Sequence, residues 1–380
     1  MKISFLCFDL SDNSLNRAVL LARALAPYYS VELVGPARKG DLWSPMKNLE
    51  LPVQRFPWKR IPAWFSVVRR LRRAIDGDVL FACKLRPTSF GIGLLEKRRT
   101  GKPLIVDIDD WELGFFLRAG FWGRVGRLLN LSNPNGMFYT WLMERRVDRA
   151  DGILVSNRFL QHRFSGTLVS HCRDTRELDP ARFDSREAKR KLGLDGTRVV
   201  MFLGTPRAHK GVDDLFAALE RLTDPRLRLV IVGADDPSRA LPERWSALKS
   251  RIVILPPIPA ERLPEHLAAA DVVAIPQRQT PDTVGQMPAK IFDAMALGKP
   301  ILSTRVSDIP EVLGDTGYLV EPGNIEEIAE TLRHIFDHPE EAQAKGRQAR
   351  QRCVTLYDTR VMTAALRELV ESVVRKHKPV

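Results

Sequence analysis

Short apolar runs alternate with amphipathic stretches through most of this 380-residue chain. Such alternation is typical of parallel α/β folds, in which crossover helices join buried strands. In the first half it predicts a helix over 14–26 and strands at 3–8, 29–35, 78–83, 103–109 and 152–156. The pattern restarts at 199–204, with further strands at 227–233, 251–256, 271–276, 300–304 and 318–320 and helices at 211–222, 261–269, 288–297 and 324–336. The sequence therefore predicts two doubly wound, Rossmann-like α/β units.

The length also favours two domains, since single cores rarely extend over so many residues. We predict a first domain over 1–175 and a second over 176–356, with the polar stretch 170–193 as the linker. Ligands of such folds bind at the carboxyl ends of the strands. A last amphipathic helix is expected from Tyr357, with four packing positions: Val361, Leu366, Leu369 and Val373.

Positive charge is concentrated in the first half. The net charge is +13, and residues 1–180 hold 29 Lys and Arg against 18 Asp and Glu. Such a half suits nucleic acid, an anionic membrane or a phosphate-bearing acceptor. No nucleic-acid-binding motif accompanies the charge, so nucleic acid is not expected as a partner.

The four cysteines lie far apart and have no metal-ligand spacing, so neither structural zinc nor a disulfide framework is expected. No apolar run reaches the roughly 18 residues of a membrane span, and the N-terminus lacks the pattern of a signal peptide. We therefore expect a cytoplasmic protein.

The loop Gly204-Thr-Pro-Arg-Ala-His-Lys-Gly211 joins a predicted strand to a predicted helix. Two cations beside a helix start suit a diphosphate, because charge-assisted hydrogen bonds and helix amides act together there. The alternative is a solvated basic turn. The loop matches neither a Walker A motif nor GxGxxG.

The predicted helix 288–297 carries Lys290 and Asp293 on one face. A carboxylate here can accept two hydrogen bonds from a ribose diol, and free amides at the helix start can meet phosphate oxygens. The alternative is a surface ion pair worth about 0.2–0.5 kcal/mol.

In order, the segments GTPRAHKG, LVIVGA, ILPPIPAERLPEHLAAADVVAIPQ, KIFDAMALGKPILST and DIPEVLGDTGYLVEPGN resemble the C-terminal half of glycosyltransferase family 4. The resemblance covers about 200–340 and implies the GT-B fold, with two domains facing across a cleft and helix 357–380 returning to the first. It implies sugar transfer with retention, without metal or other cofactor, from a UDP- or GDP-sugar. It also implies a set of donor-binding residues: Gly204, Arg207, Lys210, Ile258, Met287, Lys290 and Asp293.

Two positions depart from the family pattern. The first glutamate of its E-x7-E motif falls at Gly285, and its usual loop arginine falls at Thr205. Asp293 takes the place of the second glutamate and is one methylene shorter. The resemblance therefore implies nucleotide binding but leaves the sugar open.

Acidic residues follow the predicted strand 103–109. Asp107 and Asp109 have the D-x-D spacing that GT-A glycosyltransferases use for a metal-bound diphosphate, but a GT-A fold leaves the second α/β unit unexplained. In the family 4 alignment Asp109 falls where a histidine often lies. We predict that Asp109 or Asp110 polarises the acceptor or the donor sugar; alternatively both cap the next helix or pair with basic residues.

Asp12 and Asn13 lie where the family usually has a glycine-rich loop beside the sugar and acceptor. Either they bind the acceptor, or they cap helix 14–26, which the residue types favour.

Two stretches, 58–73 and 115–129, combine arginines with Trp and Phe. Such segments suit the surface of an anionic membrane, at about 1 kcal/mol per basic residue. The alternative is an ordinary helix with its apolar face inward. The sequence as a whole predicts a glycosyltransferase of polysaccharide or glycolipid synthesis, acting on a glycan or lipid-linked acceptor at the inner face of a membrane. The competing hypothesis is a nucleotide-sugar-binding scaffold without activity.

Overall fold

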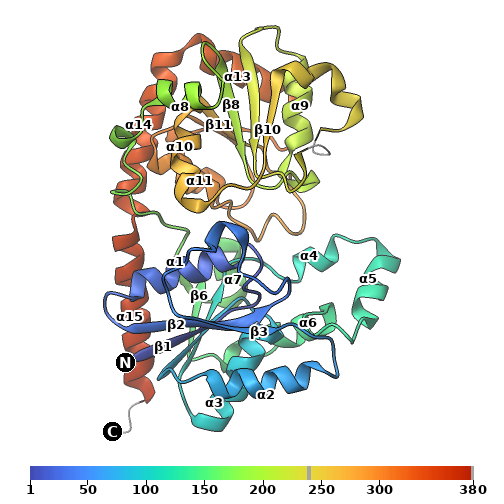
Figure 1. Cartoon of the computed structure of the whole chain (residues 1–380), viewed down its shortest axis with the longest axis vertical. Coiled ribbons are helices and arrows are strands. Elements are labelled where there is room, and N and C mark those ends of the chain that lie inside the picture. The colour runs from blue at the N-terminus through green and yellow to red at the C-terminus, as the bar shows by residue number, and fades with distance from the viewer. Residues whose placement is uncertain (238–240, 378–380) are drawn as a thin grey trace. The chain divides into compact units, whose positions relative to one another are not determined.

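A computed structural model of the chain describes residues 1–237 and 241–377. They form two compact units (Figure 1). Unit 1 comprises Met1–Ser170, Val284–Met287 and Arg360–Val380, and unit 2 comprises His171–Thr283 and Pro288–Thr359.

Unit 1 is built on a parallel sheet of seven strands among the described residues, in the order β3-β2-β1-β4-β5-β6-β7. The strands are β1 (Lys2–Leu6), β2 (Ser30–Ala37), β3 (Val53–Pro57), β4 (Val79–Cys83), β5 (Leu104–Ile108), β6 (Gly152–Val155) and β7 (Thr167–Leu168). Its helices are α1 (Leu15–Leu25), α2 (Trp64–Ala74), α3 (Ile92–Thr100), α4 (Gly114–Leu117), α5 (Phe121–Leu129), α6 (Met137–Glu144), α7 (Arg158–Phe164) and α15 (Thr359–His377).

The first sheet is covered on both faces, with α1 on one side and α2 and α3 on the other (Figure 1). Alternate strand residues serve the two faces. Phe5 stacks on Phe81 at 4.8 Å between ring centroids, whereas Leu6 and Leu80 join the core beneath α2. Double coverage explains why the central strands are near-continuous apolar runs.

Unit 2 repeats the architecture with six parallel strands among the described residues, in the order β10-β9-β8-β11-β12-β13. They are β8 (Arg198–Leu203), β9 (Leu227–Val232), β10 (Ile252–Leu255), β11 (Val272–Ile275), β12 (Ile301–Thr304) and β13 (Tyr318–Val320). The helices are α8 (Ser185–Lys191), α9 (Val212–Glu220), α10 (Leu263–Ala268), α11 (Lys290–Ala296), α12 (Ile309–Leu313), α13 (Ile325–Asp337) and α14 (Pro339–Leu356). Residues of β8, β9, β11, α9 and α13 share one buried core.

The prediction of two doubly wound α/β units is confirmed, and most predicted strands and helices lie within two residues of the observed ones. Strands β3 and β7 were not predicted, and neither were the helices α3, α6, α7, α8, α12 and α14. The polar stretch 170–193, predicted as linker, carries α8 and belongs to unit 2 from His171.

Helix α15 belongs to unit 1 from Arg360 and packs beside β6. A Cβ atom at Gly152 would lie 2.9 Å from Cγ2 of Val373. The predicted packing position Val361 is wrong, because its side chain is 44% exposed; the buried positions follow the helical spacing of Met362, Leu366, Val370 and Val373.

Candidate functional site

The predicted diphosphate loop lies at the carboxyl end of β8, at the centre of the second sheet. Residues Ala208–Lys210 form one short 3₁₀ turn before α9 starts. The Lys210 ammonium returns toward the end of the strand, so that a Cβ atom built on Gly204 would lie 3.2 Å from Nζ. Arg207 is exposed at the start of the turn, and its carbonyl accepts a hydrogen bond from Lys210 N at 2.8 Å. Two predicted donor residues, Gly204 and Lys210, are thus brought together.

Contacts to the segment after β11 fix this loop. His209 is buried, with Nδ1 3.7 Å from Oδ2 of Asp282, and its carbonyl accepts a hydrogen bond from Arg278 N at 2.9 Å. Gly211 has φ +68°, and a Cβ atom there would lie 1.8 Å from the carbonyl oxygen of Pro276. Only glycine fits this close approach, which brings the two loops together at one edge of the sheet.

Helix α11 is shorter than the predicted 288–297 and spans seven residues. Lys290 Nζ lies 3.2 Å from Asp293 Oδ2, as the ion-pair alternative predicted. Arg173, which sequence reasoning missed, also binds Asp293: Nε lies 2.5 Å from Oδ1 and Nη2 3.1 Å from Oδ2. Burial alone would raise the pKa of Asp293, but Arg173 and then Lys290 outweigh it and hold this pKa below its usual value.

The remaining predicted donor residues are more scattered. Ile258 is half-buried in the loop after β10, also at a carboxyl end of the second sheet. Met287 is buried and belongs to unit 1.

Gly285, which occupies the position of the first motif glutamate, lies in the Val284–Met287 segment of unit 1. Its surroundings show why a glutamate side chain is absent. Its carbonyl accepts a hydrogen bond from Trp111 N at 3.1 Å. A Cβ atom at Gly285 would lie 2.5 Å from Cβ of Trp111 and 3.2 Å from the ring of Phe159. A side chain at this position would therefore displace its neighbours.

The acids after β5 surround one lysine. Lys84 Nζ lies 2.7 Å from Asp109, 2.6 Å from Asp110 and 3.0 Å from Glu112. The three carboxylates lie close enough together to hold a cation, and the Lys84 ammonium already contacts all of them. Lys84 itself has φ +75°, a sparsely populated conformation for a residue with a side chain.

Burial and the neighbouring charges shift the pKa values of Lys84 and of the acids around it. Burial raises the pKa of Asp110 to about 6, against the opposing charge of Lys84. Burial also raises the pKa of Asp109. In Lys84 the three carboxylates outweigh burial and raise the pKa well above its usual value. Asp109 and Asp110 therefore form ion pairs, as one alternative predicted, while Asp110 keeps a carboxyl group that titrates near neutrality.

Asp107 has a different partner from Asp109. It is fully buried, and its Oδ1 lies 3.0 Å from Nη2 of Arg17 on α1. The two acids of the D-x-D sequence are thus held by separate cations, which fits a structural role for Asp107.

Asp12 and Asn13 lie in the turn before α1. Asp12 Oδ1 accepts a hydrogen bond from Ser14 N at 3.1 Å, which closes a turn just before the helix, and no side chain caps α1 at Ser14. Asn13 is exposed.

Comparison with known proteins gives a consistent assignment. A sequence model of the family Glycosyl transferases group 1 matches residues 197–338. The D-inositol 3-phosphate glycosyltransferase of Corynebacterium aurimucosum is 31% identical over 166 residues, which cover 40% of this chain and 38% of that protein. The GDP-mannose-dependent alpha-(1-6)-phosphatidylinositol monomannoside mannosyltransferase of Mycolicibacterium smegmatis is 29% identical over 244 residues, or 60% of this chain and 64% of that protein.

Structural similarity extends over nearly the whole chain. The structure of Anabaena Alr3699/HepE in complex with UDP-glucose superposes with a TM-score of 0.76 at 17% identity, covering 98% of this chain and all of the other. The aligned parts of the two curated relatives, by contrast, reach less than two thirds of their lengths. The chain therefore has the GT-B fold, and its residues 197–338 match the sequence model of the group 1 glycosyl transferases.

Proposed function

We propose that this chain is a glycosyltransferase that moves a sugar from a nucleoside-diphosphate sugar to an acceptor. The loop after β8 carries the proposal, because the Lys210 ammonium lies against Gly204 within the segment that matches the group 1 family. There Lys210 and the exposed Arg207 offer two positive charges to a leaving diphosphate. Each hydrogen bond to such a charged group contributes about 1.5–3 kcal/mol.

We propose a UDP- or GDP-sugar as donor and no other cofactor. The names of similar proteins support both bases, since one relative is GDP-mannose-dependent and one structural neighbour holds UDP-glucose. Family 4 resemblance favours retention without metal, and in that reaction the donor phosphate can take the proton of the acceptor.

Asp110 is our first candidate for polarising the acceptor, with Asp109 beside it. With a pKa of about 6 it is mainly a carboxylate at neutral pH, and Lys84 fixes its position at 2.6 Å. A carboxylate held in this way can accept a hydrogen bond from an attacking hydroxyl group.

The proposed acceptor is lipid-linked or a cell-envelope glycan, reached from the cytoplasmic side of an anionic membrane. Among the described residues, no helix combines the length and the hydropathy that a membrane span requires. Helix α5, however, has no buried residue, and Phe121 and Trp122 are 71% and 81% exposed. Between Glu112 and Glu144 the sequence has no acidic residue and three arginines: Arg118, Arg124 and Arg127.

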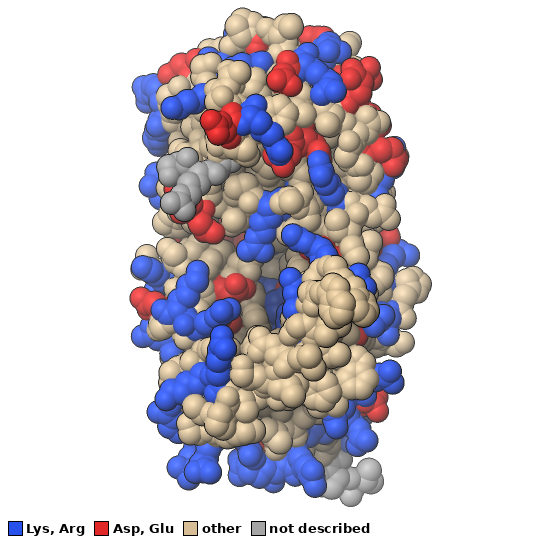
Figure 2. All heavy atoms as spheres, turned by 90° about the vertical axis from the view of Figure 1, so that its right-hand side faces the viewer, with Lys and Arg blue, Asp and Glu red and all other residues tan. Residues whose placement is uncertain are grey.

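Figure 2 views the side on which α5 lies and shows a broad area of uncharged atoms bordered by Lys and Arg. The other basic aromatic stretch behaves differently, because α2 buries Trp64, Val67 and Leu71 in the core. We therefore assign membrane contact to α5 alone.

A nucleotide-sugar-binding scaffold without activity is the second candidate. The occupied carboxylate of Asp293 and the absent side chain at Gly285 favour it, because both positions are expected to hold the donor.

The test is a screen of UDP-, GDP- and ADP-sugars by thermal shift and hydrolysis, on the wild type, Lys210→Ala and the exposed control Lys249→Ala. We expect one donor to stabilise the wild type and Lys249→Ala and to be hydrolysed slowly without metal, with both effects lost in Lys210→Ala. Binding without hydrolysis or transfer to a membrane extract would favour the scaffold. Failure of every donor to bind would refute the diphosphate site.

A further inference from the structure

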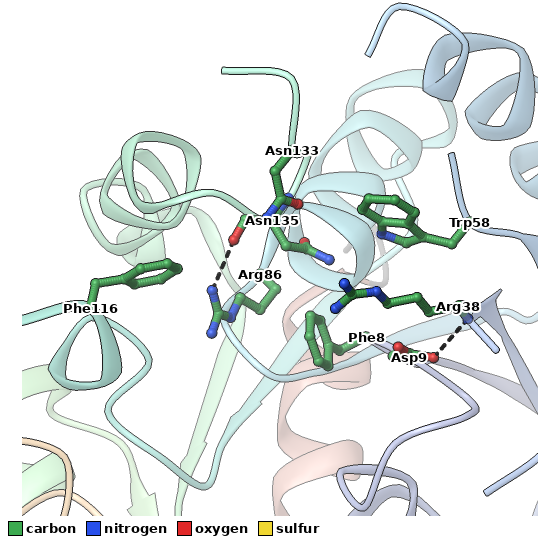
Figure 3. Close-up of a pocket in the computed structure, with 8 residues that line it drawn as sticks. All are labelled: Phe8, Asp9, Arg38, Trp58, Arg86, Phe116, Asn133 and Asn135. Carbon is green, nitrogen blue, oxygen red and sulfur yellow. Dashed lines mark hydrogen bonds between the residues drawn. The ribbon is translucent and has the colours of Figure 1, made fainter. Parts of the chain in front are cut away.

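A pocket of about 190 Å³ opens at the carboxyl edge of the first sheet, within unit 1 (Figure 3). Its residues follow strands β1 to β4, belong to α4, or lie between α5 and α6: Phe8, Asp9, Arg38, Trp58, Arg86, Phe116, Asn133 and Asn135. At about 30 Å³ per water molecule, the volume suits one ring-sized group.

Aromatic side chains form the walls and orient two guanidinium groups. Arg38 lies over the Trp58 ring at 5.4 Å, and Arg86 lies 5.4 Å from the Phe8 ring and 5.1 Å from the Phe116 ring. Such stacking holds a guanidinium group flat and leaves its N–H edge available for a planar or tetrahedral anion. The aromatic faces themselves suit the C–H faces of a sugar or polyol ring.

The two arginines differ in charge balance. Arg86 is buried, and its Nε donates to Glu112 Oε2 at 2.7 Å, so its charge is neutralised. Its Nη1 donates to the carbonyl of Asn135 and to Thr140 Oγ1, which fixes the side chain. Arg38 is exposed, and its guanidinium pairs with no carboxylate among residues 1–237 and 241–377. The pocket therefore presents one uncompensated cation.

The polar side chains beside Arg38 are fixed by hydrogen bonds and still have donors or acceptors left for a ligand. Asp9 is 7% exposed, and its Oδ1 already accepts from Ser11 N, Ser11 Oγ and Arg38 N, so that Oδ2 is the oxygen available to a ligand. Backbone donors fix the oxygens of both amides: Asn135 Oδ1 accepts from Thr88 N at 3.3 Å and Asn133 Oδ1 from Asn135 N at 3.0 Å. Their amide nitrogens are the remaining hydrogen-bond donors of these two pocket-lining side chains.

We propose that this pocket binds the acceptor through a hydroxylated ring that bears an anionic group, with the anion on Arg38 and the ring against Trp58 and Phe8. Asp9 accepts from a ring hydroxyl, and the amides of Asn133 and Asn135 donate to others. The assignment to the acceptor rests on the proposed function; binding of the anionic ring itself does not. Both a soluble sugar acid or sugar phosphate and a lipid headgroup carry this chemistry.

Calorimetry on the full chain tests the proposal with matched probes. The soluble arm compares glucose 6-phosphate, glucuronate and myo-inositol 1-phosphate with glucose and myo-inositol. The lipid arm compares nanodiscs containing phosphatidylinositol with nanodiscs containing phosphatidylglycerol, which carries equal charge without a ring. Variants are Arg38→Gln, Trp58→Ala and Arg70→Gln, the last an exposed arginine on α2 outside the pocket.

We expect at least one anionic ring to bind the wild type and Arg70→Gln tenfold or more tightly than its matched probe. Arg38→Gln removes that preference, and Trp58→Ala weakens binding of the ring. The arm in which the preference occurs identifies the source of the ring. The proposal is overturned if no anionic ring is preferred in either arm, or if Arg38→Gln keeps the preference. Donor binding, measured on the same samples, separates this outcome from failure of the proposed function.

Discussion

Arg173 and Asp293, 120 residues apart, form a buried ion pair beside α11, with Nη2 of the arginine 3.1 Å from Oδ2 of the aspartate. The carboxylate predicted to hold the donor ribose therefore already accepts hydrogen bonds from a cation of its own unit. A ribose diol binding to Asp293 has to share these oxygens with Arg173 or displace it, and either arrangement ties donor binding to the position of Arg173.

Removing the cation of this pair is expected to destabilise unit 2. Arg173→Met leaves the Asp293 charge buried with only Lys290 beside it, and loss of one partner of a buried pair costs about 3–5 kcal/mol. Urea unfolding should show a loss near the lower end of that range, because Lys290 compensates in part. Arg176→Met, at an exposed neighbouring position, should change the free energy of unfolding by less than about 0.5 kcal/mol. Equal stability of the two variants would contradict a buried ion pair.

A second prediction concerns pH and Asp110. Because its pKa of about 6 in the folded chain exceeds the ordinary value, protonation of Asp110 favours folding. This contribution is complete below about pH 4 and is lost as the pH rises through about 6. It amounts to about 2–3 kcal/mol at 1.36 kcal/mol per pKa unit.

The measurement is urea unfolding of the wild type and Asp110→Asn at pH 4, 5 and 7. The stability of the wild type relative to the variant should fall by about 2–3 kcal/mol between pH 4 and pH 7. A difference that is constant, or that grows with pH, would show that the pKa of Asp110 is not raised.

Gly285 provides a third test, on the motif position that departs from the family. Gly285→Ala forces a Cβ atom against Trp111 and Phe159 and should destabilise the fold by about 1–3 kcal/mol. Gly285→Glu, which restores the family residue, should be at least as destabilising and should not increase donor hydrolysis. Gly120→Ala is the control, since a Cβ atom at Gly120 would have no neighbour within 4 Å. Increased donor hydrolysis by Gly285→Glu would contradict this expectation and would mean that the glycine lowers activity only because it lacks the glutamate side chain.

Features that depend on local sequence patterns were predicted, and features that depend on contacts between residues far apart in the sequence were not. Central strands such as β8 and β11 were predicted because they are buried on both faces and read as apolar runs. Strand β3 was missed because it is only partly buried, and α14 because its buried positions are mainly small or sulfur-containing: Ala342, Gly346, Ala349 and Cys353.

The same distinction applies to the sites. Gly204 and Lys210 belong to one loop, so a local motif already assigned both to the donor site. Arg173 and Lys84 meet their acids only through tertiary structure, and no periodic pattern marks them. One signal was available for Lys84: it directly follows the predicted strand 78–83, and in parallel sheets the residues after adjacent strands lie at a common edge.

The last prediction tests membrane contact by α5. Phe121→Ser with Trp122→Ser removes two aromatic side chains that pack against no core, so stability should change little while binding to anionic vesicles falls at least tenfold. Flotation with phosphatidylglycerol vesicles measures the loss, and phosphatidylcholine vesicles should bind both proteins weakly because the arginines then meet no anionic lipid. Phe65→Ser is the matched control, because this aromatic residue is 64% exposed on α2, outside the α5 region. If Phe65→Ser reduces vesicle binding as much as the double variant does, membrane contact is not specific to α5. The exposed Trp122 side chain would then have to be explained by another binding partner.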